Sequence, residues 1–197
     1  WKLFLEVDEA GFYNSLKEGT VQDAINATAD ERFNAIANRK EIMLGTNQYP
    51  NFNEVMADKI DEHGEGCGCG CGHSDKPAPL KKLNKKRLAN EFNELRLATE
   101  KSGKRPKVFM LTIGNLSMRL ARSQFSSNFF ASAGYEIIDN LGFKSVEEGV
   151  MVARENGADI VVLCSSDDEY PEFAPQAKDL LKDGEEILVI AGAPACM

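Results

Sequence analysis

Residues 107–125, KVFMLTIGNLSMRLARSQF, decide the fold of this chain. An apolar run from Val108 to Leu111 is followed by a turn at Gly114 and then by a helical pattern. A strand, a turn and a helix in this order form the repeating unit of a parallel α/β sheet, whose ligands lie beyond the carboxyl ends of the strands. The loops that follow the strands are therefore where we look for chemistry.

Three more apolar runs follow at helix-length intervals, in segments YEIID (135–139), ADIVVLCSS (158–166) and EILVIAG (186–192). Between the runs we expect helices over 116–133, from Ser145 to Asn156 and over 173–181, and Ser145 with Glu148 forms a capping box that starts the second of them. Four strands separated by three helices predict parallel crossovers. The fold class is therefore α/β, with a flavodoxin-like (Rossmann-like) doubly wound parallel sheet.

The amino-terminal part is predicted to contribute a helix, a short strand and a turn. Between Thr20 and Lys40, apolar residues recur at helical spacing, at Ile25, Ala29, Phe33 and Ile36. Residues 42–44 read as a short buried strand that ends in the turn sequence GTNQYPN, from Gly45. Such a unit cannot bury its own apolar surface, so we expect it to belong to a larger α/β assembly.

Residues 63–79, HGEGCGCGCGHSDKPAP, break all periodicity and read as a linker before a helix over 84–101. The linker carries thiol and imidazole groups that could bind zinc or a soft metal, at Cys67, Cys69, Cys71 and His73. Zinc ligands normally come in spaced pairs on separate turns, whereas these are dense and lie in a glycine-rich segment. We therefore favour a flexible linker over a physiological metal site.

Composition indicates an ordinary globular protein. The chain has 197 residues, 43% hydrophobic content and a net charge of −8, and the charge disfavours nucleic acid as a partner. No apolar run approaches the roughly 20 residues that cross a bilayer, so we expect no membrane partner and a cytoplasmic location. Five is an odd number of cysteines and the expected compartment is reducing, so we expect no disulfide framework. Cys164, at the end of an apolar run, is interpreted as a small buried residue.

The loops at the expected carboxyl edge lack a catalytic set. The first, 112–118, contains no His, Asp, Glu or Cys, and its single Gly114 cannot form a phosphate loop. The second, 165–169, is rich in carboxylates, and we interpret it as a solvated loop whose Ser and Asp residues cap the next helix rather than as a metal or acid–base site. We therefore assign no catalytic residue.

Residues 105–139, RPKVFMLTIGNLSMRLARSQFSSNFFASAGYEIID, resemble the start of the cobalamin-binding domain of methylmalonyl-CoA mutase. In that family a D-x-H-x-x-G motif follows the first strand, and its His is the lower axial ligand of cobalt. The corresponding positions here are Leu116, Met118 and Ala121. The Ser-x-Leu motif of the second loop aligns with residues 165–167, and the Gly-Gly turn of the third aligns with Ala191-Gly192. The resemblance therefore implies a degenerate cofactor site.

The resemblance also extends backwards along the chain. Residues 88–108 are similar to the helix that leads into the cobalamin-binding domain, and the segment from Thr20 to the GTNQYPN turn is similar to the end of the (β/α)8 barrel. It implies an incomplete barrel end over 1–60, a linker and connecting helix over 61–103, and a degenerate, C-terminally truncated cobalamin-binding-like domain over 104–197.

The resemblance implies a role as well as a fold. In lacking the three motif residues, the chain resembles the small subunit of two-subunit mutases. These enzymes interconvert methylmalonyl-CoA and succinyl-CoA with adenosylcobalamin. The resemblance implies a heterodimer with a catalytic large subunit that holds the adenosylcobalamin, and a chain that binds no cofactor itself.

Met118, at the position of the family's His, carries a thioether that raises the question of cobalt binding. Met118 falls on a helical stripe with Ala121, Phe125 and Phe129, so we expect it to pack in the core rather than to bind cobalt.

Two functions remain for the chain. The alternative to a non-catalytic subunit is a binding module that holds a nucleotide, or a corrinoid without a protein axial ligand, in the sheet-end crevice. Its contacts would come from Ser117, Ser165, Ser166 and Gly192.

Overall fold

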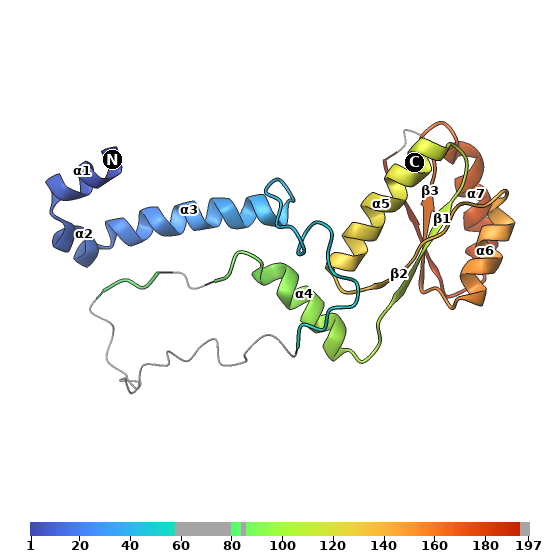
Figure 1. Cartoon of the computed structure of the whole chain (residues 1–197), viewed down its shortest axis with the longest axis horizontal. Helices are drawn as coiled ribbons and strands as arrows, with labels where there is room; N and C mark the ends of the chain where they lie inside the picture. Colours follow the sequence, from blue (N-terminus) through green and yellow to red (C-terminus); the bar gives the residue numbers. More distant parts are fainter. Residues whose placement is uncertain (58–79, 84–85, 194–197) are drawn as a thin grey trace. The chain divides into compact units, whose positions relative to one another are not determined.

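A computed structural model describes residues 1–57, 80–83 and 86–193 of the chain (Figure 1). These residues fall into two compact units. One contains residues 1–42, 80–83 and 86–91, and the other contains residues 43–57 and 92–193. We describe each unit by itself.

The first unit contains three helices, α1 (Lys2–Ala10), α2 (Phe12–Glu18) and α3 (Thr20–Ala37). The break between α2 and α3 falls at Gly19, whose φ of 87° is a left-handed conformation that glycine adopts without steric cost. Helix α3 confirms the helix predicted from Thr20 onwards. Of its predicted apolar stripe, Ile36 is buried and Ile25 is exposed.

The strand predicted over 42–44 is wrong. Leu44 is 77% exposed and forms only an isolated bridge with Gln48. The chain turns here instead, because the Asn47 side chain accepts a hydrogen bond from the Met43 amide at 2.7 Å and the Gly45 amide donates to the Gln48 carbonyl at 2.7 Å. These local hydrogen bonds occupy backbone groups that a strand would offer to a neighbour.

The second unit is built on a four-stranded parallel sheet, as predicted. Its strands are β1 (Lys107–Thr112), β2 (Glu136–Ile138), β3 (Ile160–Cys164) and β4 (Ile187–Ile190), in the order β2-β1-β3-β4. All three pairs are parallel, with Val108 opposite Ile137 in β2 and opposite Ile160 in β3. This order places the carboxyl ends of β1, β3 and β4 along one edge.

Helices cover both faces of this sheet. Helix α5 (Leu116–Ser132) lies on one face, and α6 (Val146–Glu155) and α7 (Tyr170–Leu181) lie on the other (Figure 1). The capping box predicted for α6 is present in part: Ser145 Oγ accepts from the Glu148 amide at 3.2 Å, but the Glu148 carboxylate accepts from the amide of Lys144 rather than that of Ser145. Leu111 and Leu163 lie in the core between the sheet and α6 and α7.

Helix α5 is oriented opposite to the sequence expectation. The stripe expected in the core is exposed, with Met118 at 37%, Phe125 at 61% and Phe129 at 55%. The buried face is small and polar and consists of Ser123, Ser126, Ser127, Asn128, Ala131 and Ser132. The core-packing interpretation of Met118 is therefore wrong. Small side chains let the helix lie close to the sheet, and several of their polar atoms are satisfied locally, for example by Ser132 Oγ donating to the Asn128 carbonyl at 2.7 Å.

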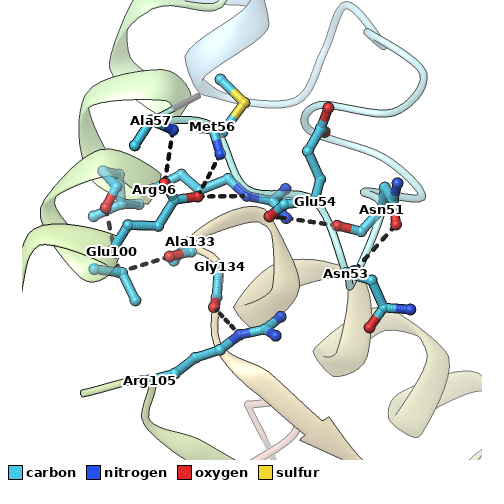
Figure 2. A network of polar contacts seen from close by, with 12 residues as sticks. Asn51, Asn53, Glu54, Met56, Ala57, Arg96, Glu100, Arg105, Ala133 and Gly134 are labelled. Atoms are coloured by element: carbon cyan, nitrogen blue, oxygen red, sulfur yellow. Dashed lines mark hydrogen bonds and ion pairs between the residues drawn. The ribbon is translucent and has the colours of Figure 1, made fainter. Parts of the chain in front are cut away.

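A polar network fixes residues 51–57 within the second unit (Figure 2). The buried Arg96 of α4 (Asn90–Lys101) donates to the carbonyls of Asn51 and Glu54, at 2.5 and 3.1 Å. Glu100 accepts from the amides of Met56 and Ala57, at 2.7 and 2.9 Å. Helix α4 begins later than the predicted residue 84, and residues 84–85 lie outside the described part of the chain.

Candidate functional site: the carboxyl edge of the sheet

The turn after β1 combines a left-handed glycine with a helix cap. Gly114 has a φ of 76°, and Asn115 caps helix α5, its side chain accepting from the Met118 amide at 3.1 Å. The three motif positions of the resemblance, Leu116, Met118 and Ala121, all lie on α5 and are exposed. None carries an imidazole or a carboxylate, so this turn offers only a thioether as a soft ligand.

The carboxylate of Glu169 occupies the space beside this turn. It accepts from the Asn115 amide at 3.0 and 3.1 Å, and from the hydroxyls of Ser165 and Ser166 at 2.6 and 2.7 Å. The Ser166 amide donates to the same carboxylate at 3.2 Å. A Cβ added at Gly114 would collide with Glu169, so the carboxylate lies directly against the turn.

These hydrogen bonds hold the pKa of Glu169 at about 2, below its ordinary value. The Ser165 hydroxyl is the largest cause, partial burial opposes it, and the Asn115 amide and the hydroxyl and amide of Ser166 add to it. The charged form is favoured because every donor in the network points at it. Glu169 is therefore a fixed anion at neutral pH.

The interpretation of 165–169 as a solvated capping loop is wrong in its detail. Helix α7 begins after Glu169 with no side-chain cap hydrogen bond. The Ser165 and Ser166 hydroxyls donate to Glu169, and Asp167 pairs with Arg122 at 2.8 Å. The serine hydroxyls are therefore used by a carboxylate within the same loop, and Asp167 is used by a cation from α5.

Arg122, from α5, fills the other side of the crevice. Its guanidinium donates to the Ala191 carbonyl at 2.6 Å and lies over the Tyr170 ring, 6.0 Å from the centroid. A Cβ at Gly192 would collide with this guanidinium. The turn after β4 therefore faces a cation of the protein itself.

Tyr170 ties the ends of β3 and β4 together beneath these groups. Its ring is fully buried, and its hydroxyl accepts from the Ser165 amide at 3.2 Å and donates to the Ala191 carbonyl at 2.7 Å. Burial is the main reason that its pKa lies above the ordinary value. The phenol is thus a structural tie in its protonated form.

The predicted crevice contacts are brought to the same edge only in part. Ser165, Ser166 and Gly192 meet there, but Glu169 engages both hydroxyls and Arg122 covers the glycine. Ser117 is exposed on the first turn of α5. Sequence reasoning missed the roles of Glu169, Arg122 and Tyr170, and the only signal available was the carboxylate-rich loop itself.

The predicted ligands Cys67, Cys69, Cys71 and His73 lie outside the described residues. Within the described ranges, no group of three or more His, Cys, Asp or Glu side chains could hold a metal ion. Burial raises the pKa of the Cys164 thiol to about 12, which confirms it as a buried, protonated residue. None of the described helices is long and apolar enough to cross a membrane.

The fold and the edge define a parallel α/β domain of the cobalamin-binding type whose ligand crevice holds its own side chains. Residues 1–95 match the family model described as methylmalonyl-CoA mutase. The whole chain is 60% identical to a methylmalonyl-CoA mutase small subunit of Porphyromonas gingivalis over 202 aligned residues, which make up 31% of that relative. Over 96% of the chain it is 29% identical to the small subunit of Streptomyces virginiae, of which the match covers 29%.

A third relative is the small subunit of Propionibacterium freudenreichii subsp. shermanii, 27% identical over 98% of the chain and 28% of that protein. The chain therefore spans about a third of the length of these relatives. The predicted resemblance is confirmed: the chain is related to the methylmalonyl-CoA mutase family and, along its whole length, to the small subunits of that family.

Proposed function

We propose that this chain forms part of a non-catalytic subunit of an adenosylcobalamin-dependent methylmalonyl-CoA mutase, and that its sheet-end crevice holds no cobalamin. One observation carries the proposal: the positions where a ligand would meet the loops are taken by Glu169 and Arg122 of the chain itself. A folded domain with a filled crevice suits a role in assembly rather than in chemistry.

The residues present do not fit a cobalamin. Leu116, Met118 and Ala121 offer no imidazole and no side-chain acceptor that could orient one. A ligand at the third loop would have to displace a guanidinium bonded to Ala191 and Asp167. At the first loop it would have to displace a carboxylate that accepts five hydrogen bonds from Asn115, Ser165 and Ser166.

The same groups weigh against the alternative of a nucleotide in this crevice. A phosphate would meet the fixed negative charge of Glu169 at the amides and hydroxyls that should bind it. The phosphate and the Glu169 carboxylate would repel each other strongly, because the site is partly buried. The filled crevice therefore supports the non-catalytic subunit over the binding module.

The proposed partner is a catalytic large subunit in a cytoplasmic heterodimer, and that subunit would hold the adenosylcobalamin. Support comes from the small-subunit names of the relatives. Analytical ultracentrifugation of the chain with a purified mutase large subunit tests the pairing. We expect a one-to-one complex, and independent sedimentation of the two components would count against it.

Titration with adenosylcobalamin and with hydroxocobalamin tests the crevice itself. We expect an unchanged corrin absorption spectrum and an unchanged melting temperature at ligand concentrations well above micromolar. A ligand present at 100 times its Kd would stabilise the fold by about 2.7 kcal/mol, a shift that a melting curve resolves easily. A stabilised complex with an altered axial-ligand spectrum would contradict the proposal and make Met118 the first candidate ligand.

A further inference from the structure

A groove separate from the crevice runs beside helix α5. Its volume is about 540 Å³, within the range of small-molecule sites, and it is lined by Tyr49, Pro50 and Phe52, by α5 and by the end of β2. All of its lining residues belong to the second compact unit. Tyr49, Phe52 and Leu120 give it exposed apolar walls.

Tyr49 is held in an unfavourable backbone conformation at the rim. Its φ of 48° lies in the left-handed region, which bulky residues rarely adopt. Asn128, on the buried face of α5, fixes it by accepting a hydrogen bond from the Tyr49 amide at 2.8 Å. Strain of this kind persists only where surrounding contacts impose it, and it concentrates at binding sites.

The floor of the groove contains a buried hydroxyl without a partner. Ser127 is 8% exposed, and its Oγ makes no hydrogen bond in the described part of the chain. A buried polar group in this state is destabilising unless a bound molecule supplies the missing partner. Ser127 lines the groove, but its Oγ is closed to solvent, so a ligand reaches the hydroxyl only after the side chain rotates.

Asp139 supplies a negative charge at the same groove. Its Oδ1 accepts from Ser123 Oγ at 2.8 Å and from the Asn140 amide at 2.9 Å. No described Lys, Arg or His forms an ion pair with this carboxylate, whereas Asp167 and Asp159 each pair with a cation. Asp139 therefore retains an acceptor for an external cation.

From these four features we propose that the groove binds a small organic cation with an apolar, ring-bearing body. The ammonium, amidinium or guanidinium group lies at Asp139, and the body lies against Leu120 and the aromatic side chains of Tyr49 and Phe52. The Ser127 hydroxyl rotates toward the ligand and gains a hydrogen-bond partner. This inference is independent of the mutase assignment, because none of its residues belongs to the crevice.

Benzamidine is a suitable probe, followed by ¹H–¹⁵N NMR shifts of the full 197-residue chain. We expect saturable, millimolar binding, with shifts confined to residues 49–52, 120–128 and 137–140. Benzyl alcohol and benzoate, which keep the ring and remove the cation, are expected to bind at least about tenfold more weakly. Absence of saturable shifts with benzamidine, or equal binding of benzyl alcohol, would overturn the proposal.

Asp139→Asn is the decisive variant, because its amide oxygen can still accept from Ser123 and Asn140 and the fold should be kept. We expect it to weaken benzamidine binding about tenfold or more, with an unchanged melting temperature. The matched control is Asp168→Asn, an exposed carboxylate of the same unit, which should leave binding unchanged. Ser127→Ala should weaken binding a few-fold without destabilising the free protein, and full affinity in Asp139→Asn would contradict the site.

Discussion

The strands of the sheet and the loops at their carboxyl ends differ in the kind of side chain that fills the space around them. The strands keep an almost continuous apolar core, with Leu111 and Leu163 fully buried between the sheet and its helices. The loops include the left-handed Gly114, and Glu169 and Arg122 lie directly against Gly114 and Gly192. Apolar packing can therefore maintain a parallel sheet while a few polar side chains fill the space beyond the ends of its strands.

The largest effect is expected in the strand core. Leu111→Ala removes a fully buried side chain that packs against Gly149 of α6, and we expect it to lower the free energy of unfolding by about 2–5 kcal/mol. Urea unfolding followed by circular dichroism measures this. The matched control is Leu116→Ala in the first turn of α5, which is exposed and should change stability by no more than about 0.5 kcal/mol.

Tyr170→Phe tests the tie between core and edge. The variant keeps the buried ring but leaves the Ser165 amide and the Ala191 carbonyl without the phenol hydroxyl. We expect a loss of about 1–3 kcal/mol, because buried polar groups lose a partner. Hydrogen exchange should show the loss as faster exchange at the ends of β3 and β4, and unchanged protection at Ser165 would argue against the tie.

Glu169→Gln probes the closed crevice through its pH dependence. The folded pKa of about 2 lies below the ordinary value of 4.5, so the carboxylate stabilises the fold above the unfolded pKa, and this contribution is lost as the pH falls from about 5 to 2. Because the group is partly solvated, we expect the variant to be less stable by only about 1–2 kcal/mol at pH 7.

The difference between wild type and Glu169→Gln should shrink steadily as the pH approaches 2. Unfolding curves at pH 7, 5, 4 and 3 measure it. Glu172→Gln, one turn away on α7, is the matched control for removing a carboxylate from this helix. A difference that stays constant with pH would mean that Glu169 does not act through its charge.

Helices α5 and α6 show how much the sequence could predict. In α6 the buried face is apolar, with Val146, Val150 and Ala153, and hydrophobic periodicity finds it. In α5 the same reasoning chose the exposed stripe of Phe125 and Phe129, because the buried face is made of serines that periodicity counts as surface. Parallel pairing follows from the alternation of strands and helices, whereas the orientation of α5 depends on close packing against the sheet.

The contents of the crevice were harder to predict for a related reason. Glu169 bonds to Asn115, and Arg122 bonds to Ala191, across more than 50 residues of sequence in each case. No local spacing rule links such positions. The sequence therefore indicated that ligand residues were absent but not which side chains stand in their place.

The smallest effect is expected on the outer face of α5. Phe125→Ser removes a ring that is 61% exposed, so we expect the free energy of unfolding to change by no more than about 0.5 kcal/mol. Phe125 also lines an apolar groove against β4, and its removal should reduce binding of the dye ANS. A loss above about 2 kcal/mol would show that the stripe is packed, as the sequence alone suggested.

The most direct measurement of the closed crevice is the pKa of Glu169 itself. The ¹³C shift of its side-chain carboxyl, assigned by comparison with Glu169→Gln, can be followed from pH 7 to pH 2. Closure by the Asn115, Ser165 and Ser166 donors predicts no titration near pH 4.5 and a midpoint at about 2. A midpoint near the ordinary value of 4.5 would contradict this account, because the carboxylate would then be solvated and the crevice open.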